Sequence, residues 1–201
     1  MTNYFFAHWI EVAGAIVSLI YLWFSIKQLI WLWPFGLLSA VFYIAVYLTS
    51  GFYADMGLQV YYVIISIYGW YHWSRGKRGN SNEATPLQIT KTPVRLMFAL
   101  FGIFLVLWGI LWLILDRLTN STIPFWDAMT TAGALVATWM LARKLLEHWL
   151  VWIVVDTVSL MLYIWKELYA TVILFVVYAI LAVSGYIQWK KSMEYPRFRS
   201  L

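Results

Sequence analysis

The sequence contains no cysteine, and only 11% of its 201 residues are charged. The absence of cysteine excludes disulfides, thiolate nucleophiles and cysteine-ligated zinc. A soluble domain needs roughly a quarter of its residues charged to keep its surface hydrated. A chain this poor in charge is therefore expected to be solvated by lipid, as a membrane protein.

The sequence also lacks the motifs of common enzyme classes. It has no His-Glu-x-x-His pair, no Gly-x-Ser-x-Gly elbow and no glycine-rich phosphate loop. Its three histidines, His8, His72 and His148, are far apart at the ends of apolar segments. The net charge of +5 comes from basic residues that also flank apolar segments, where membrane topology accounts for them better than nucleic acid does. We predict no enzyme, no nucleic-acid binding, no cofactor and no metal site.

Apolar segments dominate what is present. Each is about as long as the roughly 20 residues that a helix needs to cross a bilayer. The first carries Glu11 near its start and has no basic flank, so we expect a retained helix, not a cleaved signal peptide. The longest polar stretch, Ser74 to Pro93, is expected to be a solvated linker. The seven predicted spans cover residues 8–27, 31–49, 53–73, 94–115, 126–145, 148–165 and 168–189.

Basic residues predict the orientation of these spans. Of the 14 Lys and Arg residues, all except Arg117 and Lys166 fall on one side of the predicted topology. Cytoplasmic loops carry the excess of Lys and Arg. We therefore expect the N-terminus outside and the C-terminus in the cytoplasm.

The chain repeats itself inside the membrane. A shift of 116 positions superimposes two halves without a gap, and a rare acid, Glu11, falls on another, Asp127. Internal duplication is typical of transporters, whose substrate site lies where the halves meet. Other matched pairs are Trp23 with Trp139, Lys27 with Arg143, Trp33 with Trp149, Tyr47 with Tyr163, Tyr62 with Tyr178, Gly69 with Gly185 and Trp73 with Trp189.

The duplicated unit consists of three spans, so two copies account for six of the seven spans. The fourth span is then a linker between the two triplets. An extra crossing returns the chain to the side from which it started, so the two triplets are expected to be parallel. The fourth span is apolar all round, and we expect it to face lipid or a neighbouring subunit of a homo-oligomer. The predicted divisions are a first triplet (1–73), a cytoplasmic loop (74–93), a linker helix (94–117), a second triplet (118–190) and a cytoplasmic tail (191–201).

Polar side chains at bilayer depth are the candidates for a site. Asp156 is the deepest acid, and helical spacing places Trp152, Ser159 and Tyr163 on its face. The alternative is that Asp156 only receives a hydrogen bond from a neighbouring helix. In the third span, Gln59 lies in a polar stripe at steps of three or four that also contains Asp55, Tyr62, Ser66, Gly69 and Trp73. Gln59 could equally join two helices, and Asp55 could cap its helix.

Aromatic residues are unusually abundant, with 14 Trp and 14 Tyr. Tyr43, Tyr62, Trp152 and Tyr178 lie deep in predicted spans, where aromatic rings beside a carboxylate suit a flat organic cation. Packing within the bundle is the alternative for each ring. Interfacial belts account for the Trp residues near span ends: Trp9, Trp31, Trp33, Trp73, Trp126, Trp149, Trp165 and Trp189.

Several of these segments together resemble the PnuC family of vitamin transporters. The first half carries WLWPFG (31–36), FYADMGLQ (52–59) and GWYHW (69–73). The second half carries WLVW (149–152) and GYIQW (185–189), and the resemblance covers about residues 8–190. It implies a bacterial inner-membrane carrier of parallel three-plus-one-plus-three design, similar to the SWEET sugar transporters.

The same resemblance implies uptake of nicotinamide riboside by facilitated diffusion, followed by trapping through a cytoplasmic vitamin kinase. The family also contains thiamine and riboflavin carriers, so thiamine or another vitamin is the alternative substrate. We expect a site between the triplets, near mid-membrane, in which aromatic rings hold the substrate ring. Gln59 and Ser159 would bind hydroxyl or amide groups, and Asp156 would balance a positive charge. A membrane sensor or scaffold without transport is the rival from another class.

Overall fold

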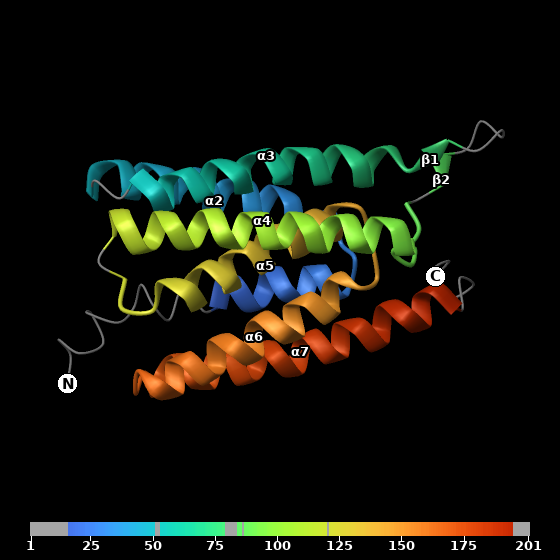
Figure 1. Cartoon of the computed structure of the whole chain (residues 1–201). Coiled ribbons are helices and arrows are strands. Elements are labelled where there is room, and N and C mark those ends of the chain that lie inside the picture. Colours follow the sequence, from blue (N-terminus) through green and yellow to red (C-terminus); the bar gives the residue numbers. More distant parts are fainter. Residues whose placement is uncertain (1–15, 51–52, 79–83, 86, 120, 195–201) are drawn as a thin grey trace, which may run out of the picture. The chain divides into compact units, whose positions relative to one another are not determined.

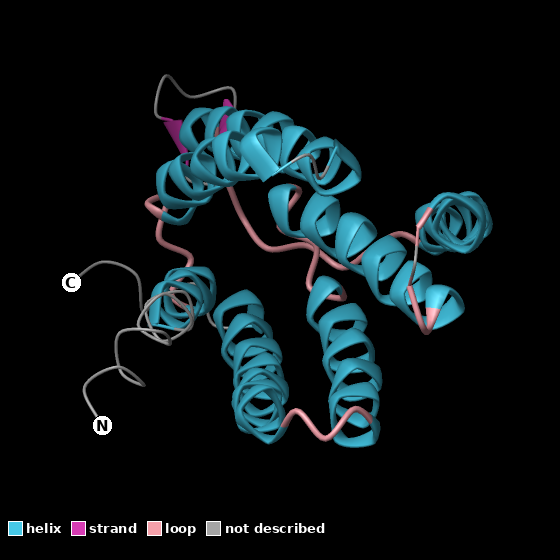
Figure 2. Cartoon of the chain, turned by 90° about the vertical axis from the view of Figure 1, so that its left-hand side faces the viewer, coloured by secondary structure: helices cyan, strands magenta, loops and turns pink. Residues whose placement is uncertain are grey.

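The computed structural model describes residues 16–50, 53–78, 84–85, 87–119 and 121–194 (Figure 1). These residues form seven helical segments, as the sequence predicts. They are Ile16–Ile26, α2 (Leu32–Ser50), α3 (Tyr53–Arg75), α4 (Val94–Leu118), α5 (Pro124–Ala142), α6 (His148–Trp165) and α7 (Tyr169–Glu194). Between α3 and α4, β1 (Lys77–Arg78) pairs antiparallel with β2 (Ala84–Thr85). Figure 2 shows how little of the described chain is loop.

Three of the described helices are long and apolar enough to cross a membrane. They are α4, α6 and the part of α7 from Thr171 to Glu194. Ile16–Ile26 and Leu32–Ala45 are shorter apolar helical stretches, and the first half of the predicted first span lies outside the described residues.

The chain divides into two compact units, Met1–Arg75 and Gly76–Leu201. In the first unit α2 packs on α3. In the second, α5 packs on α4 and α6, and α6 packs on α7. The helix α4 thus belongs to the same unit as the second triplet.

Two helix-to-helix turns share three backbone hydrogen bonds, a set that the turn between α6 and α7 also forms around Glu167. The turn before α2 and the turn before α6 close with the same pattern of backbone hydrogen bonds, which satisfies the last carbonyls of the preceding helix. Gln28 and Lys144 hold equivalent places with positive φ angles of 55° and 52°. The matched bonds are Lys27 N to Trp23 O, Gln28 N to Ser25 O and Leu29 N to Phe24 O, against Arg143 N to Trp139 O, Lys144 N to Leu141 O and Leu145 N to Met140 O.

Each unit also contains the same tryptophan–glycine contact. A Cβ built on Gly69 would lie 2.4 Å from Cζ2 of Trp33, and one built on Gly185 would lie 2.5 Å from Cζ2 of Trp149. Only glycine lets the indole approach the helix backbone this closely. A second indole packs edge-on, Trp73 against Trp33 at 5.5 Å and Trp189 against Trp149 at 5.8 Å between ring centroids.

These four tryptophans correct the predicted aromatic belts. Belt residues sit at the lipid–water boundary with their rings exposed to it. Trp33 and Trp149 are each 1% exposed, and Trp73 and Trp189 are buried as well. They form the packed contact between neighbouring helices. By contrast, Trp31, Trp126 and Trp165 are exposed.

The end of the predicted linker is not a solvated loop. Leu87 and Ile89 are buried, and Thr90 forms a parallel β-bridge with Leu145 in the turn between α5 and α6. The sequence reading failed here because a short segment with two apolar residues resembles any exposed linker.

Two polar contacts fasten this segment, residues 87–92, to the same turn. The buried Lys144 ammonium donates to the Leu87 carbonyl at 3.0 Å. The Glu147 carboxylate accepts from the Thr92 N–H at 2.7 Å and from its hydroxyl at 2.6 Å. The chain entering α4 is therefore held to the second unit.

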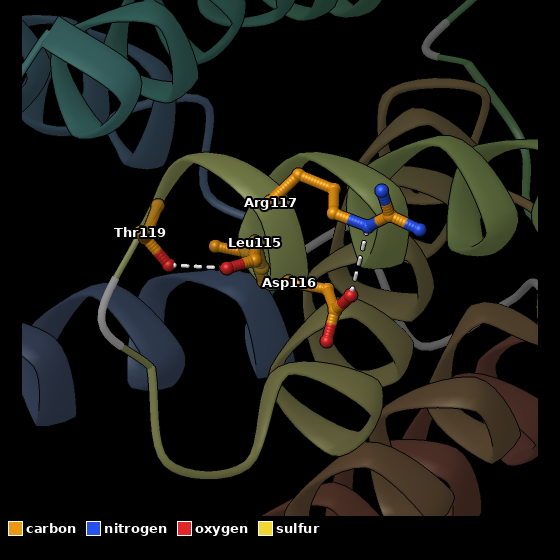
Figure 3. Close-up of polar contacts among 4 residues, drawn as sticks. All are labelled: Leu115, Asp116, Arg117 and Thr119. Atoms are coloured by element: carbon orange, nitrogen blue, oxygen red, sulfur yellow. Dashed lines mark hydrogen bonds and ion pairs between the residues drawn. The ribbon is translucent and has the colours of Figure 1, made fainter.

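The helix α4 is apolar on its surface, as predicted. Its only buried residue is Leu100, while rings such as Phe98 are exposed. One polar contact joins it to α5, from the Trp108 indole N–H to the Phe125 carbonyl at 3.0 Å. At its end, Arg117 approaches Asp116 at 3.3 Å and the Thr119 hydroxyl donates to the Leu115 carbonyl at 2.6 Å (Figure 3).

Candidate functional site

The predicted face of α6 carries a buried acid. Asp156 is 6% exposed, Ser159 is buried beside it, and Trp152 and Tyr163 are half-buried. No described residue donates a hydrogen bond to the Asp156 carboxylate. The structural alternative, an interhelical hydrogen bond, is therefore not satisfied within the described part of the chain. The carboxylate oxygens are not among the fully enclosed unpartnered polar atoms of the described residues, which are the indole nitrogens of Trp33 and Trp149 and Nε2 of His148. A carboxylate in largely apolar surroundings is nevertheless costly, and a cation that reaches those oxygens would offset that cost.

Close packing by α5 positions this acid. Small buried residues line α5, and a Cβ built on Gly133 would lie 2.6 Å from Cγ2 of Val155. The glycine lets the two backbones approach at the level of Asp156. These small residues of α5 thus serve packing, which holds α6 in place.

Aromatic rings connect α6 with α7 in the second unit. Tyr163 lies 4.9 Å from Phe175, and Phe175 lies 5.4 Å from Tyr178, between ring centroids. Two predicted site residues are therefore joined through a third ring that sequence reasoning did not select. The signal was available, because the repeat places Phe175 opposite Gln59.

The remaining predicted residues lie in the first unit. Gln59 and Tyr62 are half-buried on α3, and Tyr62 packs on Tyr61 at 5.6 Å between ring centroids. Tyr43 on α2 is exposed and packs on Phe42 at 5.9 Å. Tyr43 therefore fits a buried site less well than the other two.

The acids near helix starts act differently from Asp156. Asp127, in the first turn of α5, accepts a hydrogen bond from the Ser121 hydroxyl at 2.6 Å, which is a helix-start contact. Glu11 and the side chain of Asp55 lie outside the described residues. Among the described residues there is no group of three His, Cys, Asp or Glu side chains that could hold a metal ion.

Comparisons with known proteins identify relatives along almost the whole chain. The model of a family described as nicotinamide mononucleotide transporter matches residues 8–191. The nicotinamide riboside transporter PnuC of Escherichia coli (strain K12) is 25% identical over 217 residues, covering 96% of this chain and 90% of the relative. The riboflavin/roseoflavin transporter RibM of Streptomyces davaonensis is 27% identical over 186 residues, covering 90% and 84%.

A solved structure resembles the fold. The crystal structure of the vitamin B3 transporter PnuC aligns with a TM-score of 0.71 at 24% identity, covering 93% of this chain and 83% of that one. At this identity the likeness concerns the fold alone.

Proposed function

Since the chain belongs to the nicotinamide mononucleotide transporter family, we propose that it imports nicotinamide riboside across the bacterial inner membrane by facilitated diffusion. A cytoplasmic kinase would trap the product by phosphorylation. Family membership makes it a multi-pass membrane transporter of a vitamin-type small molecule, and the relatives at similar identity include carriers named for nicotinamide riboside and for riboflavin. The choice among vitamins rests on the chemistry of the site.

The observation that carries the choice is the buried Asp156, which lacks a described hydrogen-bond donor. A positively charged ring would supply the missing counter-charge, and Trp152, Tyr163 and Tyr178 would add stacking and cation–π attraction. The ring of nicotinamide riboside is a cationic pyridinium, whereas the ring system of riboflavin is neutral. Gln59 and Ser159 would bind its amide or hydroxyl groups. Thiamine, whose thiazolium is also cationic, is the alternative substrate.

The proposed architecture is that of two parallel three-helix repeats joined by α4, with the N-terminus outside and the C-terminus in the cytoplasm. The tryptophan–glycine contacts that recur at a spacing of 116 residues and the one-sided distribution of Lys and Arg support this arrangement. The exposed apolar surface of α4 suits contact with lipid or with a second copy in a homo-oligomer.

The test is an uptake assay in proteoliposomes that contain the full chain, using labelled nicotinamide riboside and its reduced dihydropyridine form. The reduced form keeps the ribose and the carboxamide but loses the ring charge. We expect uptake of the charged form to exceed that of the neutral form about tenfold, because charge-assisted contacts contribute about 1.5–3 kcal/mol. The variant Asp156→Asn should lose this preference by slowing only the charged form.

The matched control is Asp116→Asn, the same substitution at an exposed acid, which should transport as the parent does. Equal loss of both forms in Asp156→Asn would indicate a structural role instead of a counter-charge. Labelled thiamine in the same vesicles decides between the two cationic vitamins. If no vitamin enters through the folded parent protein, the result favours a membrane sensor or scaffold without transport.

A further inference from the structure

Positive charge gathers at one end of the second unit. The start of α4, the start of α6 and the end of α7 lie at this end (Figure 1). The described charged residues of these segments and of the turn between α5 and α6 are six cations and two acids, whereas the opposite end has two cations and three acids. The positive end has Lys91, Arg95, Arg143, Lys144, Lys190 and Lys191 with Glu147 and Glu194, and the opposite end has Arg117 and Lys166 with Asp116, Asp127 and Glu167.

The segment 87–92 places Lys91 beside the turn between α5 and α6. The Thr90 N–H donates to the Lys144 carbonyl at 3.1 Å. Lys91 is the next residue of the segment, and Arg143 directly precedes Lys144 in the turn. The side chains of Lys91 and Arg143 are both exposed. Two exposed cations from distant parts of the sequence therefore start from neighbouring points of the backbone.

Arg95, in the first turn of α4, is a third exposed cation at this end. Leu96 of α4 and Trp139 of α5 pack against the same buried cluster, so Arg95 and Arg143 lie at the same end of the contact between these helices. The Arg143 guanidinium carbon lies 5.5 Å from the centre of the Trp139 ring, a cation–π contact that orients it. Arginine suits a phosphate, because its planar fork can donate two parallel hydrogen bonds.

The exposed apolar surface of α4 begins next to these cations. Phe98 is 71% exposed and Phe101 is 58% exposed. Phe98 follows Arg95 by three residues, so the two side chains lie on the same side of the helix. The same helix is long and apolar enough to cross a membrane. A ligand with a phosphate and hydrocarbon chains would therefore meet cations at one end and apolar rings along its length.

We propose that Lys91, Arg95 and Arg143 bind the phosphate of an anionic phospholipid whose acyl chains lie along Phe98 and Phe101. A phospholipid is the occupant that uses both features, since basic residues at helix ends attract anionic headgroups and exposed rings contact the chains. A free phosphate would use only the cations. A second copy in the same membrane would bring its own positive end alongside this one, where like charges repel. The inference goes beyond the proposed function and does not depend on which vitamin is transported.

Native mass spectrometry of the purified full chain in an uncharged detergent measures the binding of phosphatidylglycerol and of phosphatidylcholine with the same acyl chains. The parent protein should bind phosphatidylglycerol more tightly. Arg95→Gln, Lys91→Gln and Arg143→Gln should each weaken only the binding of phosphatidylglycerol, by about fivefold, which is the contribution of one cation near an anionic lipid. The matched control is Arg117→Gln, which removes the same charge from the other end of α4 and should leave both affinities unchanged. Equal weakening by Arg117→Gln overturns the proposed position of the headgroup.

Glu147→Ala separates a defined site from diffuse attraction to the whole positive end. The Glu147 carboxylate accepts two hydrogen bonds from Thr92, which lies between Lys91 and α4. The variant makes this end more positive, so diffuse attraction predicts tighter binding of phosphatidylglycerol. Release of Thr92 instead loosens the placement of Lys91 and Arg95, so a defined site predicts weaker binding. Tighter or unchanged binding in Glu147→Ala overturns the proposal.

Measurements on the parent protein test the occupant without any variant that could fail to fold. Glycerol 3-phosphate has the phosphate but no acyl chains, so it should not displace bound phosphatidylglycerol. Displacement indicates a free-phosphate site, and equal affinity for the two lipids indicates no headgroup site; either result overturns the proposal. Binding of phosphatidylglycerol only to monomers dissociated from an oligomer would show that a second copy covers this face, which also overturns it. Vitamin uptake is measured separately, so each of these failures leaves the proposed function standing.

Discussion

Replacing the two packed glycines with alanine should destabilise both units by similar amounts. In Gly69→Ala the new methyl group would lie 2.4 Å from the Trp33 ring, and in Gly185→Ala it would lie 2.5 Å from the Trp149 ring. Carbon atoms in contact normally stay about 3.5–4.0 Å apart, so each ring or helix must move by about 1 Å.

The packing around each indole restricts that movement. Trp33 and Trp149 are almost fully buried, and each is flanked edge-on by a second indole. Overpacking of this kind costs about 1–3 kcal/mol. Alanine gains up to about 1 kcal/mol over glycine in a helix, which offsets part of this cost. We expect a net loss of about 1–2 kcal/mol at each site.

Other glycines provide matched controls within the same protein. A Cβ on Gly57, which shares α3 with Gly69, or on Gly102 of α4 meets no atom within 4 Å. Gly57→Ala and Gly102→Ala should therefore leave stability unchanged or raise it slightly. Thermal unfolding of each purified variant, followed by its tryptophan fluorescence, compares all four directly.

Two outcomes would contradict the close indole contact or its recurrence. If Gly69→Ala and Gly185→Ala unfold at the same temperature as the control variants, the close indole contact is wrong. If only one is destabilised, the contact does not recur in both units. Pairing Gly69→Ala with Trp33→Leu removes the clash, so the double variant should lose less stability than the sum of the single changes.

Two further predictions concern turns. Glu147→Ala removes the acceptor for Thr92, so amide hydrogen exchange over residues 87–92 should accelerate at least about tenfold. The control Glu194→Ala should leave exchange in this segment unchanged. Unchanged exchange in Glu147→Ala would show that the Glu147 carboxylate does not hold the segment. Gln28 has a positive φ of 55°, which is strained for a residue with a side chain. Gln28→Gly should therefore raise the unfolding temperature by an amount equivalent to about 1 kcal/mol. A lower unfolding temperature would contradict the turn geometry.

The sequence was sufficient to predict the helices and the repeated frame. Their signals are local: apolar length defines each span, and residues such as Gly69 and Gly185 recur at fixed spacing because the chain needs them for the same contact. The buried Asp156 was also predictable, since a single acid inside an apolar run is conspicuous.

Side-chain direction and long-range docking were not predictable in the same way. Trp33 and Trp31 are two residues apart near the start of α2, yet one is buried and the other exposed. Proximity to a span end could not separate them. The docking of residues 87–92 depends on contacts with Lys144 and Glu147, more than 50 positions later, that leave no periodic signal.

The differences between the halves are as informative as their matches. Where a contact is sterically demanding, both units keep the same residues, as Trp33 and Gly69 do with Trp149 and Gly185. Elsewhere the large side chain lies on different helices in the two halves. A Cβ on Gly36 of α2 would lie close to Tyr21 and to Ser66 of α3. The 116-residue shift places Trp152 on Gly36, Ala137 on Tyr21 and Ala182 on Ser66, so a larger residue in one segment accompanies smaller residues in the other two. When a gain in side-chain volume on one helix is balanced by a loss on its neighbours, the helices keep their packing while the polar groups between them change. Sterically demanding contacts therefore fix the residues that the two units share, and contacts that tolerate such an exchange account for the positions at which they differ.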